Sequence, residues 1–285
     1  MIQKTMYLLG VFVLSSCSKT TSNSTDSNQG PQSPEATAEW QLIFEENFDD
    51  PSLANWNPWN AGAFNNEIQL YRSAQLSTDN GILTIAAERM AIEGPTNPFD
   101  NTPKDFEYVS GRIESKSLYG PSNVAGHRSY RFTARIKLPK GNGMWPAFWS
   151  YGNEWPTNGE IDILEARGNR PMEFQSNIFY GTQPGVPLTM DAVTAKLHEM
   201  NVDLTEDYHE YEAIWTENQL RIIFDNEIIH TYHANPQNYI RALFGKKHRI
   251  VLNVAVGGVF FNNTNTNDFA DDATMQIDWV RVYRQ

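Results

Sequence analysis

Apolar and polar residues alternate with a period of two over much of the chain beyond residue 39. In the stretch 130–138, YRFTARIKL, aromatic or aliphatic residues occupy the even positions and Arg, Thr or Lys the odd ones. This period places the apolar side chains on one face of a β-strand and the polar ones on the other. The stretch therefore predicts a strand that is buried on one face only.

Further strands are expected wherever alternating or continuous apolar segments are bounded by turn residues. These segments are 82–87, 111–117, 208–215, 219–224, 227–233, 249–256 and 275–283. Between two of them, Asp225-Asn226 is typical of a two-residue hairpin turn, and the one helix we expect is short, over Tyr239–Phe244. Many short strands without a βαβ rhythm or a repeat indicate an all-β protein, a jelly-roll sandwich of two antiparallel sheets.

The N-terminal segment differs from the rest of the chain. One Lys precedes the apolar run Met6–Leu14, which is too short to span a membrane stably and is typical of a secretory signal peptide. The tetrapeptide that ends at Cys17, LSSC, resembles the lipobox of bacterial lipoproteins, in which the Cys becomes the lipidated first residue. An ordinary cleaved signal with an incidental Cys is the alternative.

Three parts of the chain follow from this. Residues 1–16 are expected to be a lipoprotein signal peptide, and residues 17–38 a lipidated Cys followed by a disordered linker, because they hold almost no apolar residue. Residues 39–285 are expected to form the folded domain. The protein is then exported and anchored in a membrane through Cys17, as a bacterial lipoprotein on the outer membrane or cell surface.

The net charge of the chain limits the classes of partner that it is expected to bind. Lys and Arg number 22 against 34 Asp and Glu, a formal net charge of -12. That sign opposes binding to phosphate backbones, so nucleic acid is not expected as a partner. It argues more weakly against a heavily sulfated polysaccharide and fits a neutral sugar polymer better.

Three acidic residues fall close together in segment 160–165, EIDILE. On a regular strand Glu160 and Asp162 share a face, whereas Glu165 points to the opposite one. A β-bulge that adds one residue after Asp162 puts all three carboxylates on one face and the aliphatic residues in the core. Glycoside hydrolysis needs such a group, since one carboxyl attacks the sugar while another donates a proton. The alternatives are a solvated acidic face or one that holds a metal ion.

Three tryptophans crowd beside these acids, in a segment that Gly and Pro break into loops and short strands. Flat apolar rings stack against the C–H face of a sugar. Trp145, Trp149 and Trp155 are therefore candidate substrate-binding residues, and a core position is the alternative for Trp149.

Together these segments resemble glycoside hydrolase family 16, particularly its laminarinase (endo-β-1,3-glucanase) branch. The resemblance covers essentially residues 40–285. It is carried by GMWPAFW at 143–149, EIDILE at 160–165, NNEIQLY at 65–71, SGRI at 110–113, LNVAVGG at 252–258 and IDWVRVY at 277–283.

The resemblance implies a jelly roll with an open substrate cleft and a retaining, double-displacement mechanism. It implies that Glu160 is the nucleophile, Glu165 the acid/base, and Asp162 the acid that assists the nucleophile. It further implies that Asn66, Arg112, Trp145 and Trp149 line the glycone side of the cleft. No cofactor is required for catalysis.

Two positions depart from the family pattern. Phe179 stands where members of the branch often place a His that reaches toward the acid/base region. The family often binds a structural calcium with an N-terminal Glu and a C-terminal Asp; Asp278 matches the latter, while Asn47 stands at the former. Asp278 is therefore the candidate ligand of a structural calcium.

The function expected from this resemblance is endo-hydrolysis of β-1,3-glucan or mixed β-1,3/1,4-glucan such as laminarin. One alternative keeps the fold and mechanism but cuts a marine galactan such as agar, porphyran or carrageenan. Another is a non-catalytic surface protein that binds polysaccharide. The intact pair Glu160 and Glu165 speaks against the second alternative.

Overall fold

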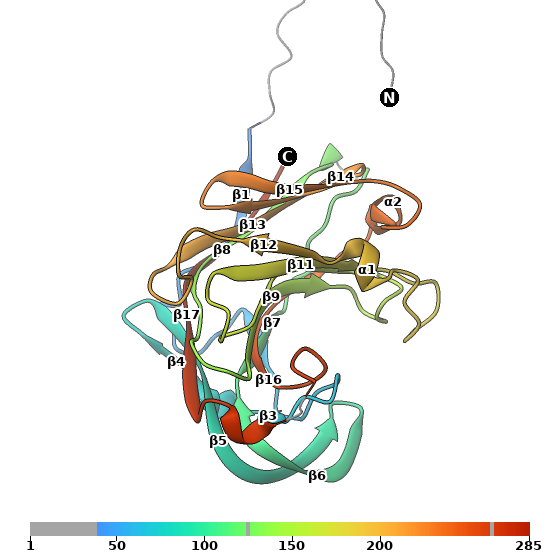
Figure 1. The fold of residues 1–285 in the computed structure, drawn as a ribbon. Helices are drawn as coiled ribbons and strands as arrows, with labels where there is room; N and C mark the ends of the chain where they lie inside the picture. The colour runs from blue at the N-terminus through green and yellow to red at the C-terminus, as the bar shows by residue number, and fades with distance from the viewer. Residues whose placement is uncertain (1–38, 124–125, 263–264) are drawn as a thin grey trace, which may run out of the picture. The chain divides into compact units, whose positions relative to one another are not determined.

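The computed structural model describes residues 39–123, 126–262 and 265–285 (Figure 1). The predicted signal peptide, Cys17 and the linker up to residue 38 lie outside the described residues. Among the residues that are described, no helix has both the length and the apolar character to cross a membrane.

Two β-sheets make up the fold, as the alternation predicts. The larger has ten strands, in the spatial order β15 (Glu227–His233), β14 (Gln219–Phe224), β13 (His209–Trp215), β8 (Tyr130–Lys137), β17 (Asp272–Arg284), β5 (Ile82–Asn97), β6 (Asp100–Ser110) and β3 (Gln69–Tyr71), with β1 (Gln41–Glu46) beside β17 and β4 (Leu76–Asp79) beside β5. The smaller has seven, in the order β12 (Lys196–Glu199), β11 (Glu173–Phe179), β10 (Glu160–Ala166), β9 (Met144–Tyr151), β16 (Arg249–Val256), β7 (Arg112–Ser115) and β2 (Trp56–Pro58).

Nearly all strand pairs are antiparallel, and the exception is β3 beside β6. The helices are short: α1 (Asp191–Thr194), α2 (Ile240–Leu243), and the 3₁₀ turns η1 (Ser73–Gln75) and η3 (Thr266–Asp268). The jelly-roll prediction and the short helix near residue 240 are confirmed, whereas α1 was not expected from the sequence.

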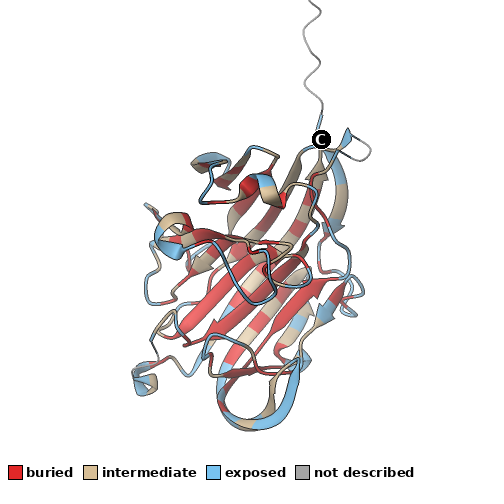
Figure 2. Cartoon of the chain, turned by 90° about the vertical axis from the view of Figure 1, so that its right-hand side faces the viewer, coloured by how far each residue is buried: buried red, intermediate tan, exposed pale blue. Residues whose placement is uncertain are grey.

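The hydrophobic core lies between the two sheets. Ile161, Phe148 and Leu252 of the smaller sheet and Phe132 and Val280 of the larger one are all fully buried. Figure 2 shows buried residues along most of the strands, and exposed ones in the connecting loops and at the bent hairpin of β5 and β6. Burial of one face of each sheet is what fixes the register of the alternating strands.

The hairpin between β14 and β15 turns as predicted at Asp225 and Asn226. Both residues have left-handed backbone angles, φ 46° and 69°. Turns of this kind match the twist of the flanking strands, and Asn and Asp tolerate the conformation better than most residues.

The hairpin of β5 and β6 is longer than the sequence predicts, because only 82–87 showed clear alternation. The pairing shifts between Arg89 and Ile92 and again between Pro95 and Asn97. Each irregularity interrupts the period of two, and proline in a strand is tolerated at such places. The hairpin bends round at one end of the molecule (Figure 1).

Candidate active site

The strand β10 carries the three acids, and it contains the predicted bulge. Asp162 pairs with Trp149 of β9, but Leu164 pairs with the very next residue, Phe148. Two steps along β10 therefore match one step along β9. Ile163 and Leu164 are both fully buried in the core, so Glu165 returns to the face that holds Glu160 and Asp162.

We call the side of the smaller sheet that faces away from the core the acid face. The register of the strands places the following residues on it: Gln175, Asn177 and Phe179 of β11; Glu160, Asp162 and Glu165 of β10; Ala147, Trp149 and Tyr151 of β9; Arg249, Val251 and Asn253 of β16; Arg112 and Glu114 of β7. The acids thus lie in the middle of a polar and aromatic surface that crosses five strands.

Burial raises the pKa of all three carboxyl groups. It raises the pKa of Glu165 to about 7. The pKa of Glu160 is raised mainly by burial and next by repulsion from the carboxyl group of Glu165. Attraction to Arg112 lowers it. Because the three groups interact, they release protons as a set. The acid face therefore keeps at least one proton near neutral pH, as general acid catalysis requires.

Asp162 differs from the two glutamates in having nothing that favours its charged form. Its side chain is 4 % exposed, and burial and the neighbouring acids all raise its pKa. Its buried Oδ2 atom has no hydrogen-bond partner among the described residues. Asp162 is thus the least able of the three to hold a negative charge.

Two donors hold the carboxylate of Glu165. The indole Nε1 of Trp145 donates to Oε1 at 3.0 Å, and Nε2 of Gln175 donates to Oε2 at 3.5 Å. The ring of Phe260 stacks on that of Trp145, with the ring centroids 4.5 Å apart, and the guanidinium of Arg167 lies 3.6 Å from the Phe260 ring. Trp145 is only 8 % exposed, so little of its ring is left open to a substrate.

A chain of hydrogen bonds fixes Trp149 on the acid face. Its Nε1 donates to Oδ1 of Asn253 at 2.7 Å, and Nδ2 of Asn253 donates to the hydroxyl of Tyr71 at 3.1 Å. Tyr71 in turn donates to the buried carboxylate of Glu67 at 3.3 Å. The predicted alternative for Trp149, a place in the core, is wrong: the residue lies opposite Asp162 and is partly exposed.

Arg112 is buried and paired. Its Nη2 donates to Oε1 of Glu114 at 2.6 Å, and its guanidinium lies 3.6 Å from the ring of Trp59 and 4.8 Å from that of Trp149. Glu114 also accepts from Tyr151 of β9 and Arg249 of β16. Arg112 is therefore a bridge between two aromatic rings of the acid face.

The two remaining predicted contact residues lie in loops. Asn66 is exposed in a turn beside Asn65, whose carbonyl accepts from Val259. Trp155 is partly exposed, and its indole N–H lies close enough to Glu160 to lower the pKa of that carboxyl. The indole Nε1 of Trp155 is buried and makes no hydrogen bond with any of the described residues.

Phe179 lies elsewhere than the sequence led us to expect. It pairs with Glu160 across β11 and β10, and it contacts Trp155 with ring centroids 6.0 Å apart. The residue opposite Glu165 is Gln175. The expectation that position 179 neighbours the acid/base region is therefore wrong, because Phe179 lies four positions along β11 from Gln175.

The surroundings of Asp278 do not favour a calcium ion. Its Oδ2 atom accepts from Nη1 of Arg135 at 2.5 Å, and a guanidinium in that place repels a cation. Asn47 is exposed. In the described ranges no group of three or more His, Cys, Asp or Glu side chains is placed to hold a metal. The structural calcium stays an untested prediction.

Several residues of the site were missed from the sequence. Trp59, Asn253, Glu114 and Gln175 each contact a predicted site residue, and Tyr71 accepts a hydrogen bond from Asn253. Tyr71 and Asn253 lie within the segments that resemble the family, so their place in those segments was a signal. No such signal in the sequence pointed to Trp59 or Glu114, because their contacts depend on which strands become neighbours in the sheet.

Known proteins resemble this chain over most of its length. The model of the glycosyl hydrolases family 16 matches residues 63–281. A glucan endo-1,3-beta-glucosidase of Cryptopygus antarcticus is 30% identical over 270 residues, which cover 86% of this chain and 92% of that protein. A beta-glucanase of Rhodothermus marinus is 27% identical over 311 residues, covering 100% and 95%.

A solved structure of another protein is also similar to this chain. The endo-beta-1,3-glucanase from Pyrococcus furiosus superposes with a TM-score of 0.70 at 27% identity, covering 86% of this chain and 94% of that one. The match of the family model spans well over half of the chain and includes all three acids of β10. The chain therefore belongs to glycosyl hydrolases family 16 and is a glycoside hydrolase.

Proposed function

We propose that the protein is an endo-acting glycosidase that hydrolyses β-1,3-glucan or mixed β-1,3/1,4-glucan. The observation that carries this is the bulged strand β10, which brings Glu160, Asp162 and Glu165 to one face. The names of the two relatives described above, a glucan endo-1,3-beta-glucosidase and a beta-glucanase, support glucan as the substrate class.

We further propose a retaining mechanism with divided roles. Glu160 attacks the anomeric carbon, and Glu165 first donates a proton to the leaving oxygen and then takes one from water. Asp162 keeps its proton and so adds no second negative charge beside the nucleophile. The contacts of Trp145 and Gln175 with Glu165 support this division, since they orient the group that must switch between protonated and charged forms.

The charges of the acid face favour a neutral polymer over a sulfated galactan. Its two cations, Arg112 and Arg249, both pair with Glu114. Sulfate recognition needs cationic donors that are not already bound to a carboxylate. The three acids add further negative charge, so a polyanionic chain would be repelled.

A panel of polysaccharides tests the substrate class. The wild-type protein should release reducing sugar from laminarin and lichenan and much less from agarose or carrageenan. Activity on agarose alone would replace the glucan proposal by the galactan one. Binding of laminarin without any turnover over long incubation would establish a binding protein instead.

Azide rescue tests the roles of the two glutamates. With an activated leaving group, Glu165→Ala still forms the glycosyl intermediate, and azide attacks it to give a product of retained β configuration. Glu160→Ala forms no intermediate, so azide enters the vacated space and gives the inverted α product. The reverse pattern of products would exchange the two assignments.

For the N-terminal segment we propose export and lipidation at Cys17, which tether the folded domain to a membrane. The apolar run before Cys17 and the polar composition after it support the proposal. It places a polysaccharide-degrading domain outside the cytoplasm, where its substrate occurs.

A further inference from the structure

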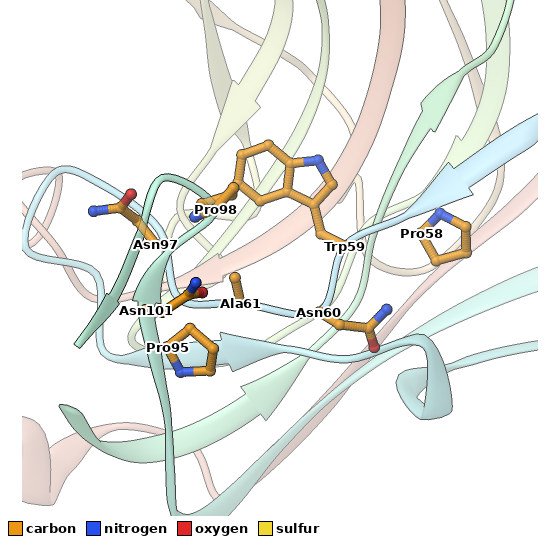
Figure 3. Close-up of a pocket in the computed structure, with 8 residues that line it drawn as sticks. All are labelled: Pro58, Trp59, Asn60, Ala61, Pro95, Asn97, Pro98 and Asn101. Atoms are coloured by element: carbon orange, nitrogen blue, oxygen red, sulfur yellow. The ribbon is translucent and has the colours of Figure 1, made fainter. Parts of the chain in front are cut away.

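A pocket of about 320 Å³ lies beside the β2 edge of the smaller sheet. Trp59 and Asn60, which follow β2, line one side, and Pro95, Asn97, Pro98 and Asn101 of the β5–β6 hairpin line the other (Figure 3). Its volume is at the lower end of the range of about 300–1,000 Å³ typical of small-molecule sites. The pocket has space for a sugar ring.

A row of stacked groups connects this pocket to the acids. Trp149 lies opposite Asp162, Arg112 lies 4.8 Å from the ring of Trp149, and Trp59 lies 3.6 Å from Arg112 on the far side. The backbone N–H of Trp59 donates to the carbonyl of Arg112 at 3.0 Å. The pocket is thus the end of a surface that begins at the catalytic strand and runs across the sheet to its edge.

The pocket offers donors that are oriented but not used. Oδ1 of Asn60 accepts from the backbone N–H of Ser73 and Oδ1 of Asn97 from that of Phe99, both at 2.9 Å. These bonds hold each amide in place, while the NH₂ groups donate to no acceptor among the described residues. Asn101 adds a third amide. Amides suit neutral hydroxyl groups, and none of the described residues that line the pocket is charged.

Packing holds the two sides of the pocket together. The backbone N–H of Gly62 donates to the carbonyl of Pro95 at 2.9 Å. A Cβ atom at Gly62 would lie 2.4 Å from the ring of Phe106, so only glycine allows this approach. The hairpin is therefore fixed against the segment after β2, and the pocket is formed before any ligand binds.

We propose that this pocket binds a neutral sugar unit of the glucan chain, beyond the units that lie over Trp149 and Arg112. The inference rests on the proposed function and adds a distal contact to it. The ring of Trp59 stacks against the C–H face of the sugar, and the amides of Asn60, Asn97 and Asn101 bond its hydroxyl groups. The hairpin tip then sets how long a chain must be for full binding.

The test is the dependence of kcat/KM on chain length, measured with β-1,3-gluco-oligosaccharides of increasing length. In the wild type, kcat/KM should rise once the chain reaches the pocket. In Trp59→Ala and Asn101→Ala, the ratio of kcat/KM for long chains to that for short chains should fall by roughly tenfold, the loss expected for one or two such contacts. Trp59→Phe should keep most of the ratio.

The matched control is Glu93→Ala, an exposed residue of the same hairpin that does not line the pocket. It should leave the ratio unchanged, and thermal unfolding checks that each variant is folded. A ratio that stays at the wild-type value in both Trp59→Ala and Asn101→Ala would overturn the pocket while leaving the glucanase proposal intact. Wild-type protein that cleaves neither β-1,3- nor mixed β-1,3/1,4-gluco-oligosaccharides would instead refute the proposed function itself.

Discussion

At the scale of single residues, the side chain of Glu165 shows how neighbours set the state of a carboxyl group. Burial raises its pKa to about 7, while the hydrogen bonds from Gln175 and Trp145 work in the opposite direction. Donors to a carboxylate favour its charged form. The two residues therefore keep the pKa of Glu165 within the range where it can serve as acid and base in turn.

Removal of the indole N–H should move the pH profile. Trp145→Phe keeps a ring against Phe260 but no longer donates to Glu165, so the pKa of Glu165 should rise. Because Glu165 must be protonated to donate to the leaving oxygen, the basic limb of kcat/KM should shift to higher pH. Trp155→Phe, whose indole affects Glu160 instead, serves as the comparison. A basic limb that moves to lower pH in Trp145→Phe would contradict this account.

The same burial should cost stability above neutral pH. The pKa of Glu165 is raised in the folded state, from 4.5 to about 7. The folded state therefore binds more protons than the unfolded state between these values, so stability falls as pH rises through this window. Glu165→Gln cannot ionise and escapes the loss.

The measurement is Tm against pH. At about pH 8, Glu165→Gln should unfold at least roughly 2–4 °C above the wild type, the shift expected for about 1 kcal/mol in a domain of this size. The difference should shrink toward about pH 4.5, where the wild-type group is protonated in both states. The control is Glu217→Gln, which removes the charge of Glu217 in its exposed ion pair with Arg128. Its Tm difference from the wild type should show no such pH dependence. A Tm difference between Glu165→Gln and the wild type that grows toward acid pH would contradict the predicted direction of the effect.

At the scale of elements, the alternation of apolar residues carried the prediction far. It located β8 and β14–β16 almost to the residue, and the spacing of the acids in β10 required a bulge, since a regular strand would have buried one carboxylate. The hairpin of β5 and β6 was underestimated because its bulges interrupt the period that reveals a strand. Local pattern thus predicts strands only while they remain regular.

The smaller sheet is held across three strands by one carboxylate. Glu114 of β7 accepts from Arg112, from Tyr151 of β9 and from Arg249 of β16. Glu114→Ala leaves the buried Arg112 without its partner, which should lower the free energy of unfolding by about 3–5 kcal/mol. Glu114→Gln keeps an acceptor and should lose less.

Urea denaturation measures this loss, and the exposed pair of Arg128 and Glu217 provides the control. Glu217→Ala should change the free energy of unfolding by only about 0–1 kcal/mol, as exposed ion pairs do. If Glu114→Ala lost no more than Glu217→Ala, Glu114 would not connect the three strands in solution.

At the scale of the whole molecule, the site depends on contacts that no local pattern contains. Trp149 bonds Asn253, and Asn253 bonds Tyr71, over sequence separations of 104 and 182 residues. The order of strands decides these neighbours, and the sequence pattern predicts strands without their order. The resemblance to the family supplied the candidate catalytic residues, but it could not supply Trp59 or the hairpin tip, which lie outside the segments that carry the resemblance.

The final prediction concerns where the folded domain is held. The apolar run Met6–Leu14 followed by Cys17 predicts a lipid anchor. Two or more acyl chains anchor a protein far more firmly than one. Wild-type protein, expressed in a bacterium that processes lipoproteins, should therefore partition with the membrane fraction, while Cys17→Ala should not. Ser18→Ala, the neighbouring position, should behave as the wild type. Equal solubility of the wild type and Cys17→Ala would show that Cys17 is incidental and the signal is an ordinary cleaved one.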